Sequence, residues 1–177
     1  MGWLDLLPGF GSHPASQEFD SEELDREASR LAEEAIGESV TVAVLTNETG
    51  RSDYPILAYL EDDERPQYVL QGTELLISDA DGSVARKHPT RKLQVVVSDR
   101  RFLFVVGDRR SDDLWEVRYE NVTDLYVDDD DWRRYVVVEA DRDDAEMTFF
   151  ADVTLEERAA DVDAAVEHAS DARSGRA

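Results

Sequence analysis

At 177 residues the chain is long enough for one domain of ordinary size with additional elements and a substantial core. Its 42 acidic residues against 19 basic ones give a formal net charge of −23, which disfavours nucleic acid as a partner. The chain has no cysteine, which excludes disulfides, thiol catalysis and cysteine-ligated metal ions.

The acidic residues are spread over the whole length, and the only lysines are Lys87 and Lys92. This composition resembles that of proteins from salt-loving archaea, in which dense salt screens the repulsion between acidic groups. We therefore interpret acidic runs as solvated faces rather than as metal sites. Because no stretch approaches the roughly 20 apolar residues of a membrane-spanning helix, we expect a soluble cytoplasmic protein.

Residues 1–19 are predicted to form an apolar tip followed by a polar linker. The tip lacks the basic flank and the long apolar stretch of a signal peptide. Three interpretations stay open: packing on its own domain or a sister chain, a frayed end, and contact with a membrane or partner. Asp5 and the lack of a cation weigh against an anionic membrane. The large apolar residues of the tip are Trp3, Leu4, Leu6, Leu7 and Phe10.

Residues 20–50 are predicted to form a helix and a strand that precede the main domain. Asp20 is a candidate N-cap with Glu23 three residues later, and Gly37 supplies the stop. The apolar stripe of this helix is narrow, which predicts that it covers a surface rather than fills a core. The β-branched run at 39–46 predicts a strand.

The main domain is predicted to span residues 51–170, with a disordered tail at 171–177. A short helix is expected within 54–64, opened by Pro55 in its first turn. Successive strands are short and closely spaced, which favours antiparallel pairing. The predicted strands are 68–77, 93–98, 101–106, 114–119, 133–139 and 145–150.

An amphipathic helix is predicted to close the domain. Thr154 is its candidate cap, Glu157 completes a capping box, and apolar residues follow Leu155 at intervals of three and four. Such a helix needs a groove in which to bury its apolar stripe, and one end of an open or barrel-like sheet offers that groove.

Three segments of the sequence resemble prokaryotic pleckstrin-homology-like (PH-like) domains. In "VVVSDRRFLFVVG" a Ser-Asp pair precedes basic residues and an apolar run, and in "LWEVRYENVTDLYVD" a strand ends in an apolar-x-Tyr-x-x-apolar pattern. The "RRYVVVEAD" and "AEMTFFAD" hairpin and the closing helix complete the resemblance, which covers residues 55–170. It implies an α+β fold: a partly open antiparallel β-barrel of two near-orthogonal sheets, capped by the C-terminal helix, here with an N-terminal helix and an extra strand.

The Ser-Asp signature also has a direct physical interpretation. Ser98 and Asp99 are suited to a tight turn, from which Arg100 and Arg101 are expected to leave the barrel with solvated heads. The strand that follows has phenylalanine at 102 and 104 on one face and aliphatic residues at 103 and 105 on the other. Both faces are therefore predicted to be covered.

The cations around residues 86–110 have two interpretations. One is ion pairing with neighbouring acids, and the other is a binding site for an anionic ligand or a lipid headgroup, which PH-like domains often bind with basic residues near the first strand pair. The spacing departs from the lipid-binding pattern, since Arg91 and Lys92 are adjacent and do not share one strand face. The candidate ligand-binding residues are Arg86, Lys87, Arg91 and Lys92.

No catalytic residue, cofactor or metal ligand is predicted. His13, His88 and His168 fall in a linker, a loop and a helix, with no recognisable nucleophile and base. The "DADGS" segment resembles part of a calcium loop, but Ile77 and His88 occupy its first and twelfth positions, so a turn is favoured. We expect a non-catalytic interaction or scaffold module that binds protein partners or self-associates, with membrane contact as a minor alternative.

Overall fold

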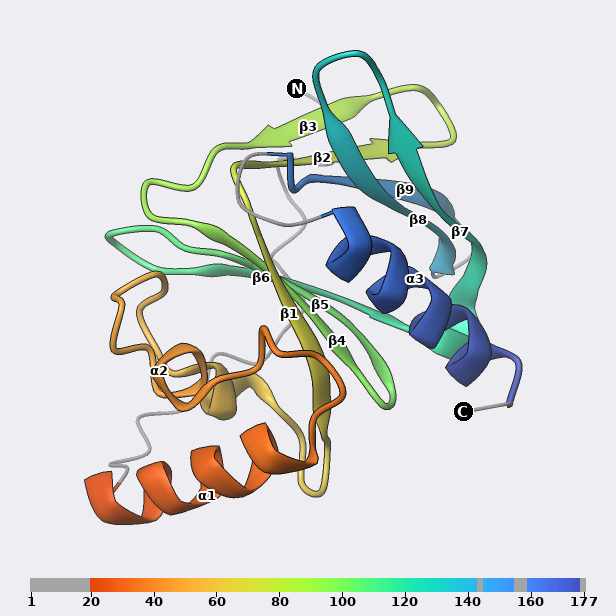
Figure 1. Ribbon diagram of the computed structural model, residues 1–177. Coiled ribbons are helices and arrows are strands. Elements are labelled where there is room, and N and C mark those ends of the chain that lie inside the picture. The colour runs from red at the N-terminus through yellow and green to blue at the C-terminus, as the bar shows by residue number, and fades with distance from the viewer. Residues whose placement is uncertain (1–19, 143–144, 155–158, 176–177) are drawn as a thin grey trace.

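A computed structural model of the chain describes residues 20–142, 145–154 and 159–175, and two antiparallel sheets form most of it (Figure 1). The first sheet contains, in spatial order, β1 (Pro66–Gly72), β4 (Leu93–Ser98), β5 (Arg101–Val106) and β6 (Asp113–Arg118). The second contains β3 (Val84–Lys87), β2 (Glu74–Asp79), β9 (Ala145–Asp152), β8 (Arg134–Arg142) and β7 (Val122–Asp129).

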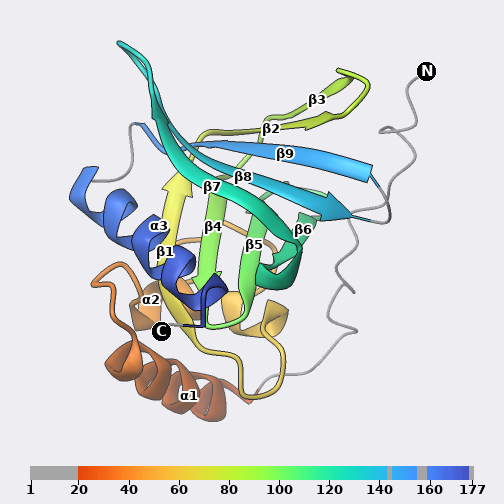
Figure 2. The ribbon, with the colours of Figure 1, turned by 90° about the vertical axis from the view of Figure 1, so that its right-hand side faces the viewer.

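The predicted fold class is confirmed. The strands of the two sheets cross steeply, and the sheets enclose an apolar core without closing into a barrel (Figure 2). The C-terminal helix α3 (Ala159–Arg173) packs on this core through Val162, Ala165 and Ala169. The capping box proposed for its start involves residues 155–158, which lie outside the described residues.

The strand predicted at 68–77 is in fact two strands in different sheets. The chain leaves β1 at Gly72 and enters β2 at Glu74. A Cβ atom at position 72 would lie 2.3 Å from the backbone oxygen of Asp152, so glycine permits the close backbone approach at this sheet switch. The prediction joined the two strands because apolar residues continue across the break.

Two further strands, β3 and β7, were not predicted. The polar residues of both segments gave no clear alternation of apolar and polar residues, and short strands with exposed side chains give a weak pattern. Between β6 and β7 the chain makes the short 3₁₀ helix η3 (Tyr119–Asn121), which carries it from the first sheet to the second.

A second apolar cluster lies on the opposite face of the first sheet. Helix α1 (Ser21–Glu34), the short helix α2 (Val42–Leu45) and the 3₁₀ helix η2 (Ile56–Tyr59) cover this face (Figure 1). Ala28 and Leu31 are the buried residues of α1, which confirms that its narrow stripe covers a surface. These N-terminal elements therefore pack on the domain itself.

The strand predicted at 39–46 is wrong. Residues 42–45 form α2, whose N-cap Thr41 accepts a 3.3 Å hydrogen bond from the backbone N–H of Val44. Val40, Val44 and Leu45 bury their side chains in the second cluster, so packing overrides the β preference of the branched residues. The helix expected within 54–64 is limited to the single turn η2.

Strand β5 confirms the prediction of two covered faces. Phe102 and Phe104 lie in the core between the sheets, and Leu103 and Val105 lie in the cluster under the N-terminal helices. All four side chains are fully buried. Among the helices that the structure describes, none is long and apolar enough to cross a membrane.

Helix α1 should be an integral part of the folded domain. We expect Leu31→Ala to lower the free energy of unfolding by about 2–4 kcal/mol, because it removes a buried side chain and leaves a cavity. Ile36→Ala is the matched control, since Ile36 is 61% exposed, and it should change stability by less than about 0.5 kcal/mol. Urea unfolding measures both, and an equally small effect of the two variants would show that α1 is not docked.

Candidate functional site

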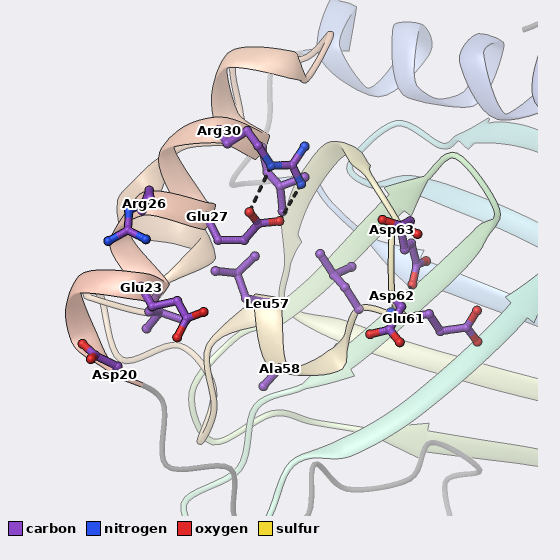
Figure 3. A pocket seen from close by; sticks show the side chains of 14 residues that line it. Asp20, Glu23, Arg26, Glu27, Arg30, Leu57, Ala58, Glu61, Asp62 and Asp63 are labelled. Atoms are coloured by element: carbon purple, nitrogen blue, oxygen red, sulfur yellow. Dashed lines mark hydrogen bonds and ion pairs between the residues drawn. The ribbon is translucent and has the colours of Figure 1, made fainter.

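A groove of about 830 Å³ lies between α1 and the segment that follows η2 (Figure 3). One wall is the face of α1 that carries Glu23, Glu27 and Arg30, and the other includes Asp62 and Asp63. The remaining lining residues are Asp20, Leu24, Arg26, Leu31, Leu57, Ala58, Leu60, Glu61 and Glu64. The groove therefore lies entirely on the N-terminal layer, outside the two sheets.

The floor of the groove is apolar. Leu24, Leu57, Ala58 and Leu60 are half-buried, so each keeps part of its side chain accessible. Figure 3 shows Leu57 between the wall that bears Glu27 and the wall that bears Asp62. A strip of this kind can bind apolar side chains of a ligand while the charged rim stays in water.

The α1 wall is held by caps and ion pairs. The Asp20 side chain accepts a 2.9 Å hydrogen bond from the backbone N–H of Glu22 and so caps the helix. Arg30 pairs with Glu27 at 2.5 Å and with Glu34 at 2.9 Å on the exposed surface. The bond from Arg30 lowers the pKa of Glu27, although partial burial opposes the shift.

The opposite wall is a tight turn that presents two exposed carboxylates. The Glu64 backbone N–H donates to the backbone oxygen of Glu61 at 3.1 Å, and Asp63 takes a left-handed conformation with φ of 60°. Arg100 fixes the turn from outside by donating to the backbone oxygen of Asp62 at 3.1 Å. Asp62 and Asp63 consequently project from a defined position on the rim.

A buried ion pair anchors this wall to the first sheet. Arg101 donates from Nε to Oε1 of Glu64 at 2.9 Å and from Nη2 to Oε2 at 2.7 Å. The Ser98 hydroxyl donates to the same carboxylate at 2.7 Å, and Arg101 also contacts Glu61 and Glu116. We call these five residues the Arg101 cluster. The prediction of a solvated head is correct for Arg100 but wrong for Arg101, whose side chain is only 4% exposed.

The charge of Glu64 depends on this cluster. Burial alone would raise the pKa of Glu64, but the hydrogen bonds from Arg101, the Glu61 backbone and Ser98 outweigh it, so the pKa is lowered. Two charges removed from water are stable together only when both are fully hydrogen-bonded. The cluster meets this condition, since both Glu64 oxygens accept bonds.

A second buried carboxylate fixes η2 above the sheet. Asp112 is 1% exposed and accepts hydrogen bonds of 2.6 Å from the Tyr59 hydroxyl and from the backbone N–H of Asp53. Burial and then the bond to Asp112 raise the pKa of Tyr59 well above its ordinary value. The groove floor at Leu57 is thus tied to the loop between β5 and β6.

The four basic residues singled out in the sequence have different positions. Arg86 and Lys87 lie on β3, and Arg91 and Lys92 lie in the connection to β4. Arg86 lies 3.6 Å from Glu74, Lys87 lies 3.2 Å from Asp113, and Arg91 lies 3.1 Å from Asp53. Arg91 also donates to the backbone oxygen of Ser52. Three of the four therefore pair with three different acids from three parts of the chain.

The histidines of the described residues differ in environment. His88 is 63% exposed and lies 3.2 Å from Glu74. His168, which looked exposed from the sequence, is half-buried on α3 with its ring 5.9 Å from that of Tyr68, and burial lowers its pKa. His13 lies outside the described residues. Within the described part of the chain, no group of three His, Asp or Glu side chains is arranged to hold a metal ion.

The two tryptophans of the described residues have opposite environments. Trp115 belongs to the core between the sheets and is 2% exposed. Trp132 lies between β7 and β8 and is 85% exposed, so it is not a core residue. The acidic run 128–131 that precedes it ends β7, and within it Asp129 pairs with Arg134 at 2.6 Å.

Sequence reasoning did not identify the groove. Leu24 was placed on the apolar stripe of the predicted helix, but the facing wall depends on a turn whose position is set by Arg100 and Arg101, far along the chain. The acidic residues of the groove walls did not stand out in the sequence, because acidic residues are frequent along the whole chain. The sequence did contain one sign of an apolar floor, the leucines at 57 and 60. Leu57 lies within the single turn of η2, and Leu60 follows it directly.

Comparison with known proteins gives a resemblance to solved structures. No protein-family model matches the chain, and no curated protein matches it. Among solved structures, the chain is similar to the pleckstrin homology (PH) domain of USP37, with 9% sequence identity and a TM-score of 0.39 over 61% of this chain and 98% of that chain. The fold class therefore depends on the two sheets and the closing helix described above.

The Arg101 cluster should make stability sensitive to acid. At neutral pH we expect Glu64→Gln to lower the free energy of unfolding by about 3 kcal/mol, because Arg101 loses its main buried partner. The lowered pKa means that Glu64 stabilises the fold above its unfolded pKa of about 4.3 and that this stabilisation is lost as pH falls through the folded pKa.

The cost of Glu64→Gln should consequently be largest above about pH 5 and shrink at lower pH. Urea unfolding from pH 7 to pH 3 at constant salt measures this difference. Glu120→Gln is the control, since Glu120 is exposed, and its effect should stay near zero at each pH. A cost for Glu64→Gln that is independent of pH would contradict a charged, paired Glu64.

Proposed function

We propose that this protein is a non-catalytic interaction module that binds a protein segment in the groove between α1 and residues 57–64. The observation that carries the proposal is the half-buried leucine floor between two anchored, acidic walls. The anchoring matters because a preformed groove loses little conformational entropy when a ligand binds. The floor and rim offer burial and charge rather than reactive groups, which supports binding rather than catalysis.

The chemistry of the groove defines the partner as a basic amphipathic segment. Seven lining residues are acidic and two are arginines, and one of these arginines, Arg30, is paired with Glu27. Apolar side chains of an amphipathic helix would contact Leu24, Leu57 and Leu60, and lysine or arginine beside them would face Asp62 and Asp63. Acid is abundant elsewhere on this chain, so the leucine floor is the feature that distinguishes the groove from the rest of the surface.

The groove predicts a specific response to a peptide probe. We expect a synthetic amphipathic peptide of leucine and arginine to bind more tightly than a leucine–glutamate peptide of the same pattern. Leu57→Gln should weaken binding of the basic peptide about tenfold, or about 1.4 kcal/mol, because it removes apolar contact without changing charge.

Fluorescence anisotropy in about 1 M salt measures this binding, since the Debye length there is only about 3 Å and non-specific attraction is screened. Val84→Gln is the matched control: Val84 is 61% exposed but lies on β3, away from the groove. Equal weakening by both variants, or binding that disappears completely in salt for the unmodified chain, would contradict a site in the groove. Light scattering at the same salt separates this function from self-association.

The alternative proposal is an anionic ligand or lipid headgroup at residues 86–92. The observation in its favour is that Arg86 and His88 are 58% and 63% exposed although both contact Glu74. Under this proposal, binding to acidic-lipid vesicles should fall at least tenfold when Arg86, Lys87, Arg91 and Lys92 are changed to glutamine. Sedimentation with vesicles measures it, and no binding, or binding that the four changes leave intact, would exclude this proposal.

A further inference from the structure

The outer face of the second sheet carries a continuous row of side chains across five strands. The strand registers pair Arg86 with Leu76, Leu76 with Phe150, Phe150 with Val137, and Val137 with Tyr126. Side chains alternate along a strand, and the neighbours Ile77, Phe149, Val136 and Leu125 lie in the core between the sheets. The row therefore lies on the opposite, outer face.

This row is apolar between two more polar ones. On one side it is flanked by Ser78, Thr148, Glu139 and Asp124, and on the other by Glu74, Asp152 and Asp128. Tyr135 widens the apolar row, because its ring makes an edge contact with Phe150 at 6.5 Å. Within the row, Leu76 and Phe150 are half-buried, and Tyr126 is 37% exposed.

None of the described helices covers this face. Helices α1 and α2 and the turn η2 pack on the far side of the first sheet, and α3 packs on the core between the sheets. Figures 1 and 2 agree on this arrangement, with the second sheet and α1 at opposite ends of the domain. A band of large apolar side chains on a sheet face is typical of a docking surface.

We propose that residues 1–10 of the same chain dock on this row. These residues lie outside the described part of the chain and include Trp3, Leu4, Leu6, Leu7 and Phe10. They form a concentrated group of large apolar side chains in the sequence. The sheet row offers them a complementary apolar surface.

The connection is long enough for this contact. The described chain begins at Asp20, the N-cap of α1, and Phe10 lies ten positions before it. Ten extended residues span about 35 Å, and a domain of this length has a radius of gyration of about 16 Å. This radius corresponds to a diameter of about 40 Å, so Phe10 alone would fall slightly short of the far side. Trp3, which is seventeen positions before Asp20 and can extend about 60 Å from it, can reach the second sheet.

Charge favours the tip of the same chain over the other possible occupants. A second copy would bring a further net charge of −23 to the surface, whereas a tethered segment binds at high effective concentration and carries only Asp5. The tip is also poorly suited to the groove, since Asp5 would meet the acidic rim there. At the sheet, the row ends in Arg86, a cation.

Distance measurement between spin labels tests the proposal directly, and the lack of native cysteines makes labelling unambiguous. One label is attached through Ser12→Cys, just after the tip, and the second through Thr148→Cys beside the row. Asp62→Cys, on the groove rim, is the matched control position. We expect a short, narrow distance distribution to 148, a longer one to 62, and no change on dilution with unlabelled protein.

Each other outcome overturns the proposal. A short distance to 148 that disappears on dilution would assign the face to a second copy, and a short distance to 62 would place the tip in the groove. A long, broad distribution to both positions would show that the tip is undocked. As a further test, Leu6→Asp with Leu7→Asp should broaden the distribution to 148, while peptide binding in the groove stays within about twofold because the row lies on the second sheet and the groove lies on the N-terminal layer.

Discussion

Strands β4 and β5 are apolar on both faces, so the first sheet requires cover on two sides. On one side the second sheet and α3 supply it and complete the two-sheet architecture. On the other side the chain uses its first described segment, residues 20–60, which forms an additional helical layer. The groove lies within this layer, between α1 and the turn after η2, and leucines from both sides line its floor.

The parts of this architecture that could be predicted are those encoded locally. The bounds of β4 and β5 follow from their own apolar runs, and the turn between them follows from Ser98 and Asp99. The division between β1 and β2 could not be predicted, because the reason for Gly72 is the backbone of Asp152, which lies far along the chain. The helix at Val42–Leu45 and the burial of Arg101 likewise depend on residues that are distant in sequence. Val69 shares an apolar cluster with the helix, and Glu64 pairs with Arg101.

The basic stretch in this acidic chain is explained mainly by charge balance within the fold. Arg101 neutralises a fully buried carboxylate, Arg118 contacts Glu61, and Arg91 connects the start of β4 to the loop around Asp53. Arginine suits these positions because its planar group donates several bonds in fixed directions, which a lysine cannot do. Arg101 therefore acts where a carboxylate has lost water, whereas Arg30 pairs with acids that stay exposed. These ion pairs hold the walls of the candidate site in place, and the exposed carboxylates of its rim make it acidic.

The split between β1 and β2 also determines the order in which the sheets can form. The first sheet needs only residues up to Arg118, and β4, β5 and β6 are adjacent in sequence. In contrast, Glu74 of β2 pairs with Asp152 of β9, a separation of 78 residues (152 − 74). Long-range pairing of this kind is slow because a large loop must close before any contact is gained. During synthesis, β2 and β3 therefore wait as an isolated hairpin until the last strand emerges, and the charged side chains of β3 protect that hairpin from pairing with other chains in the interval.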